Sequence, residues 1–350
     1  TNSADSEING TFTLRGGWLV ANGTVTLTGS ATWSGGAGIA GAVGVVNQGT
    51  LRIASGDPNL QRTTLRNRGT IIHGDAYLDF LYGGVVENEA GGVYDIQATD
   101  NREVLRRHWD YEGRTYAFSN AGTLRKSVGT GTAWFDGIPL NNAPGGVVEV
   151  QAGTLNLSGG GTSTGGTFTV AAGAVLDLTG GSTHTWTGTY TGSGEGAVAL
   201  QSGKLTAGTG GATLDFPAGL FRFQGSGGLA GADGFTNTGV LTIASGDPNL
   251  QRTTLRNRGT IIQVDGRLDF EYGGVVENEA GGVYEMQGAG SGDALQRQYD
   301  WEGRTYAFNN AGTVRKTVGA GSWSLGGIPF NKAPGGVVEV EAGTLNLRGG

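Results

Sequence analysis

The chain contains no cysteine and only one methionine among its 350 residues. Without thiols it can form no disulfide and offers no thiolate ligand, so thiol redox chemistry and cysteine-based metal sites are excluded. A secreted protein that lacks disulfides needs another source of stability. Continuous backbone pairing along a repetitive fold would supply it.

Proline, basic residues and long apolar runs are also scarce. Only 7 residues are proline and no Gly-X-Y period occurs, so the 70 glycines do not indicate collagen. No apolar run approaches the roughly 20 residues of a membrane span, and we therefore expect no membrane insertion. The 23 basic residues are outnumbered by 30 acidic ones, and the net charge of −7 argues against a nucleic-acid partner.

Short β-rich segments separated by glycine fill most of the chain. VVEV at 147–150 and TLNL at 154–157 are examples. The i, i+3, i+4 spacing of an amphipathic helix does not occur, whereas β-branched segments bounded by glycine are typical of strands. Because 37% of the residues are hydrophobic and 7 are tryptophan, the chain is too apolar for a disordered glycine-rich linker. These features predict a packed all-β protein.

An internal duplication organises the sequence. The segment Ile53 to Ile72 recurs unchanged at Ile243 to Ile262, so the offset between the two copies is 190. Extended without a gap, this offset pairs 51–160 with 241–350, and 78 of the 110 pairs are identical. In the fifty residues upstream the match falls to 11 pairs. A fixed internal period is the sequence signature of repeat architectures.

Asparagine recurs shortly before glycine, and its successive sequence spacings in each copy are 20, 21, 32 and 21. Asparagine and glycine tolerate positive φ, and a corner about every 20 residues is what a coil of parallel strands requires. An antiparallel sandwich would instead turn roughly every 8 to 12 residues. The rhythm predicts a parallel β-helix with an asparagine ladder at its corners. The asparagines are Asn47, Asn67, Asn88, Asn120 and Asn141 in the first copy, and Asn237, Asn257, Asn278, Asn310 and Asn331 in the second.

We therefore predict one continuous β-solenoid over residues 1–350, with about 20 to 22 residues per turn. Its parts are leading turns at 1–50, the first copy at 51–160, intervening turns at 161–240 and the second copy at 241–350. The longest asparagine interval exceeds one turn by about 11 residues. We assign that surplus to protruding loops at 99–113 and 289–303, of which only five of 15 positions match.

The segment GGVVEVQAGTLNLSGGGTSTGGTFTVAAGAVLDLTGG at 145–181 resembles the repetitive passenger regions of filamentous-haemagglutinin-like and autotransporter-type bacterial proteins. The resemblance implies a right-handed parallel β-helix that is exported to the bacterial cell surface and has an adhesive or structural role. No functional residue is transferred with it. The C-terminal AGTLNLRGG also predicts that the natural chain continues, because the same motif in the first copy leads into further strands.

Parallel β-helices also include polysaccharide lyases and hydrolases, which combine clustered acids with arginine or lysine. Candidates for such chemistry are Arg107, His108, Asp110, Glu112 and Arg114. The duplication serves as a control, because His108 becomes glutamine and His73 becomes glutamine in the second copy. No histidine mechanism can therefore be common to both copies. We expect ion pairs here, with no catalytic residue, no metal and no cofactor.

The same loops are candidates for ligand binding, because WDYEGRTYAF and YDWEGRTYAF alternate aromatic and acidic residues and a strand would place the rings on one face. If the loops pack on the solenoid, which we favour, Trp109 and Trp301 will be largely buried, and replacement of Trp109 by alanine will cost roughly 3 to 5 kcal/mol. Exposed rings would favour a ligand. The candidates are Trp109, Asp110, Tyr111, Glu112, Arg114, Tyr299, Asp300, Trp301, Glu302 and Arg304.

Two further motifs have simpler interpretations. DPNLQR, which contains Asp57, is a turn and lacks the repeated carboxylates of a calcium loop. Arg62, Arg66 and Arg68 form a basic patch that recurs in the second copy. The patch either meets acidic patches on a neighbouring molecule or covers the solenoid surface with its aliphatic stems.

These observations favour a non-enzymatic structural or adhesive segment of a long extracellular bacterial protein. Its expected partners are neighbouring copies of itself, the continuation of its own chain, and a cell-surface glycan. The alternative is a carbohydrate-active β-helix that binds or cleaves polysaccharide through the two loops.

Overall fold

The structure is a computed structural model that describes residues 3–109, 113–299 and 303–347. Within these ranges the chain forms strands and turns without any helix, and so contains no helix able to cross a membrane. The chain divides into two compact units, Thr1–Asp177 and Leu178–Gly350. Each unit contains one copy of the duplicated block.

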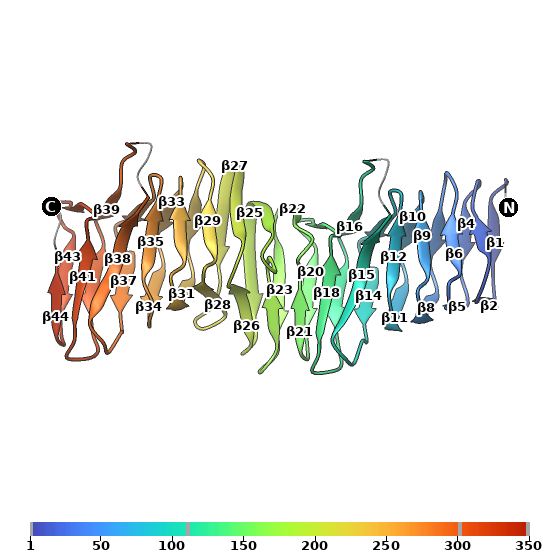
Figure 1. Ribbon diagram of the computed structural model, residues 1–350, viewed down its shortest axis with the longest axis horizontal. Helices are drawn as coiled ribbons and strands as arrows, with labels where there is room; N and C mark the ends of the chain where they lie inside the picture. The colour runs from blue at the N-terminus through green and yellow to red at the C-terminus, as the bar shows by residue number, and fades with distance from the viewer. Residues whose placement is uncertain (1–2, 110–112, 300–302, 348–350) are drawn as a thin grey trace. The chain divides into compact units, whose positions relative to one another are not determined.

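In the first unit every turn of the chain adds one strand to each of three parallel sheets (Figure 1). Sheet 1 contains β1 (Ser6–Ile8), β4 (Val25–Leu27), β7 (Val45–Asn47), β10 (Thr64–Asn67), β13 (Val85–Asn88), β16 (Ala117–Asn120) and β19 (Leu140–Asn142), with β22 (Gly161–Ser163) beside β19. Sheet 2 contains β2 (Thr11–Leu14), β5 (Ser30–Trp33), β8 (Thr50–Gly56), β11 (Thr70–Ala76), β14 (Val93–Ile96), β17 (Thr123–Lys126), β20 (Val147–Val150) and β23 (Gly166–Val170). Sheet 3 contains β3 (Trp18–Val20), β6 (Gly38–Ala40), β9 (Asn59–Gln61), β12 (Leu78–Leu81), β15 (Arg102–His108), β18 (Thr132–Asp136), β21 (Thr154–Asn156) and β24 (Val175–Asp177).

The second unit repeats this arrangement, and its two long strands β25 (Thr183–Ser193) and β27 (Lys204–Asp215) run through a corner. β27 pairs with β29 near one end and with β30 near the other. By their place in the duplicated block, the equivalents of sheet 1 are β30 (Phe235–Asn237), β33 (Thr254–Asn257), β36 (Val275–Asn278), β39 (Ala307–Asn310) and β42 (Phe330–Lys332). The equivalents of sheet 2 are β26 (Ala197–Leu200), β28 (Phe221–Gly225), β31 (Val240–Gly246), β34 (Thr260–Gln263), β37 (Val283–Met286), β40 (Thr313–Lys316) and β43 (Val337–Val340). The equivalents of sheet 3 are β29 (Gly228–Ala230), β32 (Asn249–Gln251), β35 (Leu268–Glu271), β38 (Gly292–Gln298), β41 (Ser322–Gly326) and β44 (Thr344–Asn346).

The register of sheet 1 follows the asparagine rhythm predicted from the sequence in its first three intervals, and its last interval is longer by one residue. Its buried side chains pair from turn to turn through Val45, Leu65, Val86, Phe118 and Leu140. The corresponding sequence separations are 20, 21, 32 and 22, the same as those between the asparagines that end these strands. All-β structure built as a parallel β-solenoid is therefore confirmed. That the two units belong to one continuous solenoid stays a prediction.

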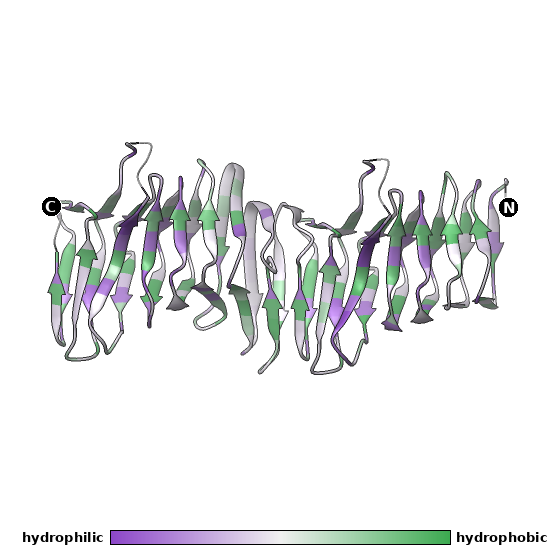
Figure 2. Ribbon diagram, in the orientation of Figure 1, coloured by the Kyte–Doolittle hydropathy of each residue, from purple (hydrophilic) through white to green (hydrophobic). Residues whose placement is uncertain are grey.

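The core of each unit consists of side chains stacked on their equivalents one turn away. On sheet 2 of the first unit the inward column runs through Leu51, Ile71, Tyr94, Leu124 and Val148. Four of these five side chains are completely buried, and the fifth, Leu51, is 2% exposed. Residues between them point outward, and the resulting alternation of hydrophobic and hydrophilic positions is visible along the strands (Figure 2). Alternation of this kind is what a sheet with one buried face requires.

The predicted asparagine ladder is present in the interior of the first unit. Each amide Nδ2 donates to the Oδ1 of the asparagine on the next turn, at 2.8, 2.7, 2.8 and 2.7 Å. The amides also donate to backbone carbonyls; the Asn67 amide, for example, lies 2.9 Å from the carbonyl oxygen of Val93. The ladder comprises Asn47, Asn67, Asn88, Asn120 and Asn142. Asn141 is thus wrong as the last member, because β16 and β19 pair Asn120 with Asn142 and leave Asn141 outside the ladder.

The second unit has a shorter ladder. Asn237, Asn257, Asn278 and Asn310 are joined by Nδ2-to-Oδ1 hydrogen bonds of 2.8 Å each. The predicted last member, Asn331, is exposed and bonds to Asn309 on the surface instead. The residue that takes the place of Asn142 is Lys332, which cannot accept a hydrogen bond. Asn310 therefore ends the ladder and donates to the Val337 carbonyl oxygen at 3.0 Å.

A second polar group of the core differs between the copies but keeps its bonding pattern. His73 is fully buried, its Nδ1 lies 2.8 Å from the Tyr94 hydroxyl, and its Nε2 lies 3.2 Å from the Ala76 carbonyl oxygen. Since a carbonyl can only accept, Nε2 carries the proton and Nδ1 accepts from tyrosine. In the second copy Gln263 accepts from the Tyr284 hydroxyl at 2.9 Å. Burial, the largest effect, lowers the pKa of His73 to about 4, so the ring is neutral in the folded protein.

The ladder predicts an asymmetry between buried and exposed asparagines. Asn88→Ala removes hydrogen bonds to Asn67, Asn120 and the Thr123 carbonyl oxygen, and leaves those buried groups without partners. We expect it to lower the free energy of unfolding by about 3 kcal/mol, measured by urea denaturation. The control, Asn331→Ala, should change it by less than about 0.5 kcal/mol. Equal effects would show that the ladder contributes nothing.

The pKa of His73 predicts a component of acid sensitivity. As pH falls from about 6.5 to about 4, the unfolded chain binds a proton that folded His73 excludes, so the free energy of unfolding decreases. The decrease should be on the order of 3 kcal/mol over that window. His73→Gln, which copies Gln263, should remove this component. Denaturation curves of both proteins between pH 4 and pH 7 measure it, and parallel curves would refute it.

Candidate functional site

The outward face of sheet 3 in the first unit brings together residues from five successive turns; we call it the sheet 3 surface. Leu60 and Phe80 point into the core, and the residues on either side of them face outward. The register aligns two outward rows, Trp18, Gly38, Asn59, Asp79 and Arg106, and Val20, Ala40, Gln61, Leu81 and His108. Of the residues proposed from the sequence as catalytic candidates, His108 lies in these rows.

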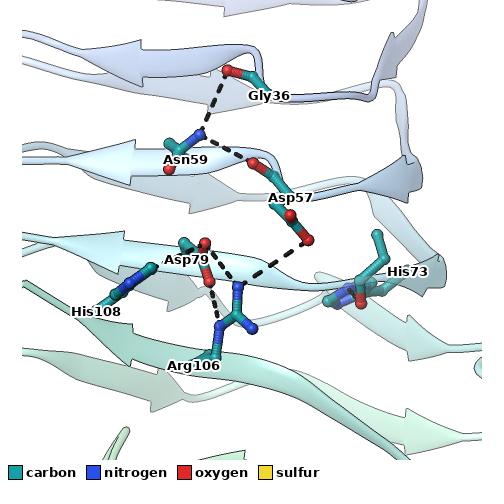
Figure 3. Close-up of polar contacts among 8 residues, drawn as sticks. Gly36, Asp57, Asn59, His73, Asp79, Arg106 and His108 are labelled. Carbon is teal, nitrogen blue, oxygen red and sulfur yellow. Dashed lines mark hydrogen bonds and ion pairs between the residues drawn. The ribbon is translucent and has the colours of Figure 1, made fainter.

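An ionic cluster occupies the part of this surface formed by β12 and β15 (Figure 3). Arg106 binds Asp79 through two hydrogen bonds of 2.7 and 2.9 Å, and lies 4.0 Å from Asp57. His108 Nδ1 lies 3.3 Å from the same Asp79 carboxylate. The guanidinium also stacks over the Tyr77 ring at 4.8 Å. The side chain of Asp79 is 4% exposed, so this carboxylate is buried beneath its partners.

The second unit keeps the carboxylates and takes the arginine from another sequence position. Asp269 and Asp247, the counterparts of Asp79 and Asp57, both contact Arg267, at 2.6 and 3.4 Å. Arg267 corresponds to Tyr77, whereas the counterpart of Arg106 is Gln296. Burial raises the pKa of Asp269, and the hydrogen bonds from Arg267 and Gln298 oppose that rise. The guanidinium comes from a different sequence position in each unit but contacts the equivalent pair of carboxylates. The cluster therefore acts as an ionic link between turns.

The loops predicted at 99–113 and 289–303 are shorter than expected. Arg102–His108 is strand β15, which pairs with β12 and β18, and Gly292–Gln298 is the equivalent strand β38. The charged residues of these segments led to the prediction of a loop. In β15, however, Val104 and Leu105 point inward and are fully buried. The chain therefore leaves the sheet only after His108. There Arg107 stacks over buried Tyr116 at 4.8 Å, and the second copy repeats this contact.

Only part of the predicted binding set can be placed. Asp110, Tyr111, Glu112, Asp300, Trp301 and Glu302 lie outside the described residues. Trp109 is 53% exposed and stacks on His108 with ring centroids 5.0 Å apart, and Tyr299 is 59% exposed. The expectation that Trp109 is largely buried is therefore wrong. Arg114 lines a groove that is described below, and Arg304 is its counterpart in the second copy.

Trp109 belongs to a column of strained corner residues. Arg62, Tyr82 and Trp109 follow sheet 3 on successive turns and have φ values of 47°, 51° and 57°. Their counterparts Arg252, Tyr272 and Tyr299 have the same conformation, and no other non-glycine residue in the described ranges has positive φ. Arg62 stacks over the Tyr82 ring at 5.2 Å. Left-handed backbone is costly for bulky residues and is retained where the surroundings enforce it.

The predicted basic patch separates into individual contacts. Arg66 pairs with Glu87 at 3.0 Å, and Arg68 pairs with Glu89 at 2.7 Å, each one turn away. Both pairs are surface-exposed, so each contributes little to stability. Across the described parts of the chain, His, Asp and Glu side chains nowhere gather in a group of three or more suited to a metal ion.

A groove on the sheet 3 surface was not predicted from the sequence. It has a volume of about 530 Å³ and lies where β3 and β6 meet the strained corner. Trp18 is 48% exposed at its wall. The lining residues are Trp18, Val20, Ala40, Gly41, Ala42, Gln61, Arg62 and Arg114. Trp18 lies in the region of weak internal match, so the duplication gave no signal for it.

Comparison with protein-family models, curated proteins and solved structures gives no match to this chain. Of what the resemblance to filamentous-haemagglutinin-like and autotransporter-type proteins implies, the structure supports the parallel β-solenoid fold, and no match supports the family itself.

The exchange of arginines predicts a compensating set of substitutions. Arg106→Gln should lower the free energy of unfolding by about 3 kcal/mol, because Asp79 is left buried without its cation. Adding Tyr77→Arg and Arg102→Gly, which installs the residues of the second unit and removes a like charge, should recover most of that loss. Thermal or urea unfolding of the single and triple variants measures the effect. A triple variant no more stable than the single one would disprove the compensation.

Proposed function

We propose that this chain is a non-enzymatic structural or adhesive segment of a long extracellular bacterial protein of the filamentous-haemagglutinin-like or autotransporter type. The observation that carries the proposal is the exchange of arginines around Asp79 and Asp269. A catalytic arginine would have to keep its position relative to the substrate, whereas a link between turns only has to reach its carboxylate. In the second copy Gln298 takes the place of His108, and it hydrogen-bonds Asp269, the counterpart of Asp79.

The interior supports a mechanical role. Parallel backbone pairing and the asparagine ladders join each turn to the next by many short hydrogen bonds. A stack of this kind resists local opening without disulfides, which suits a spacer or stalk outside the cell. The expected partners are neighbouring copies, the continuation of the same chain, and glycans at the surface to which it adheres.

A carbohydrate-binding role for the loops is the second candidate. The exposure of Trp109 and Tyr299 favours it, because half-exposed aromatic rings offer flat apolar surface to a sugar ring. Both rings stand at the same corner in the two units. Since one is tryptophan and the other tyrosine, stacking area matters more there than a particular hydrogen bond.

The proposal predicts an absence of cleavage. The full chain, incubated with bacterial and algal polysaccharides, should release neither unsaturated nor reducing sugars above the level of heat-unfolded protein. Sustained release that is abolished by Asp79→Asn or Asp269→Asn would contradict the non-enzymatic assignment and establish the carbohydrate-active alternative. A glycan array run on the same sample separates binding from inert support.

A further inference from the structure

The corner between β8 and β9 contains the aspartyl-prolyl peptide bond Asp57–Pro58, and the duplication repeats it as Asp247–Pro248. No other aspartate in the sequence precedes a proline. A bond of this type can be broken by its own side chain. The aspartate carboxylate reaches the carbonyl carbon of its own residue through a five-membered ring, and the proline nitrogen leaves as a secondary amine.

The corner exposes the carboxylate to water and holds the leaving group. The Asp57 side chain is 59% exposed, and that of Asp247 is 58% exposed. Pro58 is buried, and its carbonyl oxygen accepts a hydrogen bond of 2.9 Å from the backbone N–H of Asp79. The nucleophile can therefore move, whereas the proline stays fixed on sheet 3.

In the first unit an amide group is directed at the carbonyl that the carboxylate would attack (Figure 3). Asn59 Nδ2 donates to the backbone oxygen of Asp57 at 2.9 Å. This oxygen belongs to the peptide bond between Asp57 and Pro58, and it gains negative charge when the carbonyl carbon is attacked. A donor at that distance stabilises the developing oxyanion.

The second copy has the same sequence around its bond but a different contact. Among the residues that the structure describes, no hydrogen bond joins the Asn249 amide to the Asp247 carbonyl, and Asn249 Oδ1 is buried without a partner. This oxygen lies 2.8 Å from the position that a Cβ atom would take at Gly228. In the first unit the Trp18 ring fills the equivalent space beside Gly38. The scissile carbonyl of the second copy therefore lacks its donor.

The two carboxylates also differ in how closely an arginine holds them. Arg267 lies 3.4 Å from the Asp247 carboxylate, whereas Arg106 lies 4.0 Å from that of Asp57. A close ion pair neutralises part of the charge on the carboxylate and directs it toward the guanidinium, which weakens it as a nucleophile. Both differences favour reaction at Asp57.

We propose that Asp57–Pro58 is a self-cleavage site and that Asp247–Pro248 is a much slower one. A carboxylate oxygen of Asp57 attacks the backbone carbonyl carbon of the same residue, and the Asn59 amide stabilises the oxyanion. The bond from that carbon to the Pro58 nitrogen then breaks as the nitrogen takes a proton from solvent. One water molecule opens the cyclic anhydride. The net change is hydrolysis of one peptide bond.

The nick should leave the fold assembled. β8 pairs with β5 and β11, and β9 pairs with β6 and β12, so the strands on both sides of the broken bond remain hydrogen-bonded to neighbouring turns. The two pieces should separate only in denaturant. The inference goes beyond the proposed structural or adhesive function and does not depend on it.

The test incubates the full chain at a mildly acid pH at which circular dichroism shows it to be folded, and identifies fragments by mass spectrometry after denaturation. Fragments 1–57 and 58–350 should accumulate about tenfold faster, or more, than fragments 1–247 and 248–350. In urea at the same pH the two bonds should be cleaved at equal rates, because their sequence surroundings are identical. Equal rates in the folded chain, or no cleavage there, would overturn the proposal.

Matched variants assign the groups. Asp57→Glu keeps the charge but must close a six-membered ring, and it should slow cleavage at this bond about tenfold or more. Asn59→Leu should reduce the rate to that of the second copy, while Asn249→Leu should change neither rate. All variants should keep the melting temperature of the parent within a few degrees. Cleavage after residue 57 that persists in Asp57→Ala, or that is unaffected by Asn59→Leu, would contradict the mechanism.

Discussion

Hydrogen bonding between the backbones of successive turns is the constraint on which the rest of this structure depends. Parallel strands about 4.8 Å apart place each side chain beside the one at the same register position, whatever lies between them in sequence. A buried polar side chain can then be satisfied by a copy of itself. Asn67 donates to one neighbour and accepts from the other, so a column of amides costs little to bury.

The same constraint explains why the surface can change while the frame does not. Asp79 and Asp269 need a guanidinium within reach, and the register offers two positions from which one can come, either just before the strand itself or on the next turn. At another point the register places Trp18 in one unit and Lys204 in the other above a glycine. Differences of this kind give the two units different outward surfaces on the same backbone arrangement, so the two units can differ in what they bind.

The fold could be predicted because its determinants are local and periodic. The asparagine intervals gave the turn length, and the ladder was anticipated except at its end, where the pair Asn141 and Asn142 offers two candidates that only strand pairing distinguishes. The strand β15 was mistaken for loop because its outward residues are charged, and its two buried residues are too few to produce a pattern. Charge on one face of a short strand does not reveal which face is buried.

The candidate site was less predictable because it depends on contacts across turns. An offset of 190 pairs Trp18 with Gly208, yet the strands align it with Lys204, since the turn before β29 is longer than the turn before β6. Likewise, the replacements of Tyr77 by arginine and of Arg106 by glutamine in the second copy look unrelated in the sequence. They are seen to compensate each other only when the structure shows that both positions lie beside Asp79 or its counterpart. Neither relation is visible without the register.

Disulfide trapping tests the register most directly, and a chain without cysteine is well suited to it. Arg66 and Glu87 face each other on β10 and β13, and paired Cα atoms about 5 Å apart allow a disulfide. Arg66→Cys with Glu87→Cys should therefore cross-link rapidly under mild oxidation. Arg66→Cys with Glu89→Cys, roughly 8 Å apart, should remain reduced. Cross-linking of the second pair in preference to the first would contradict the pairing of β10 with β13 and the account built on it.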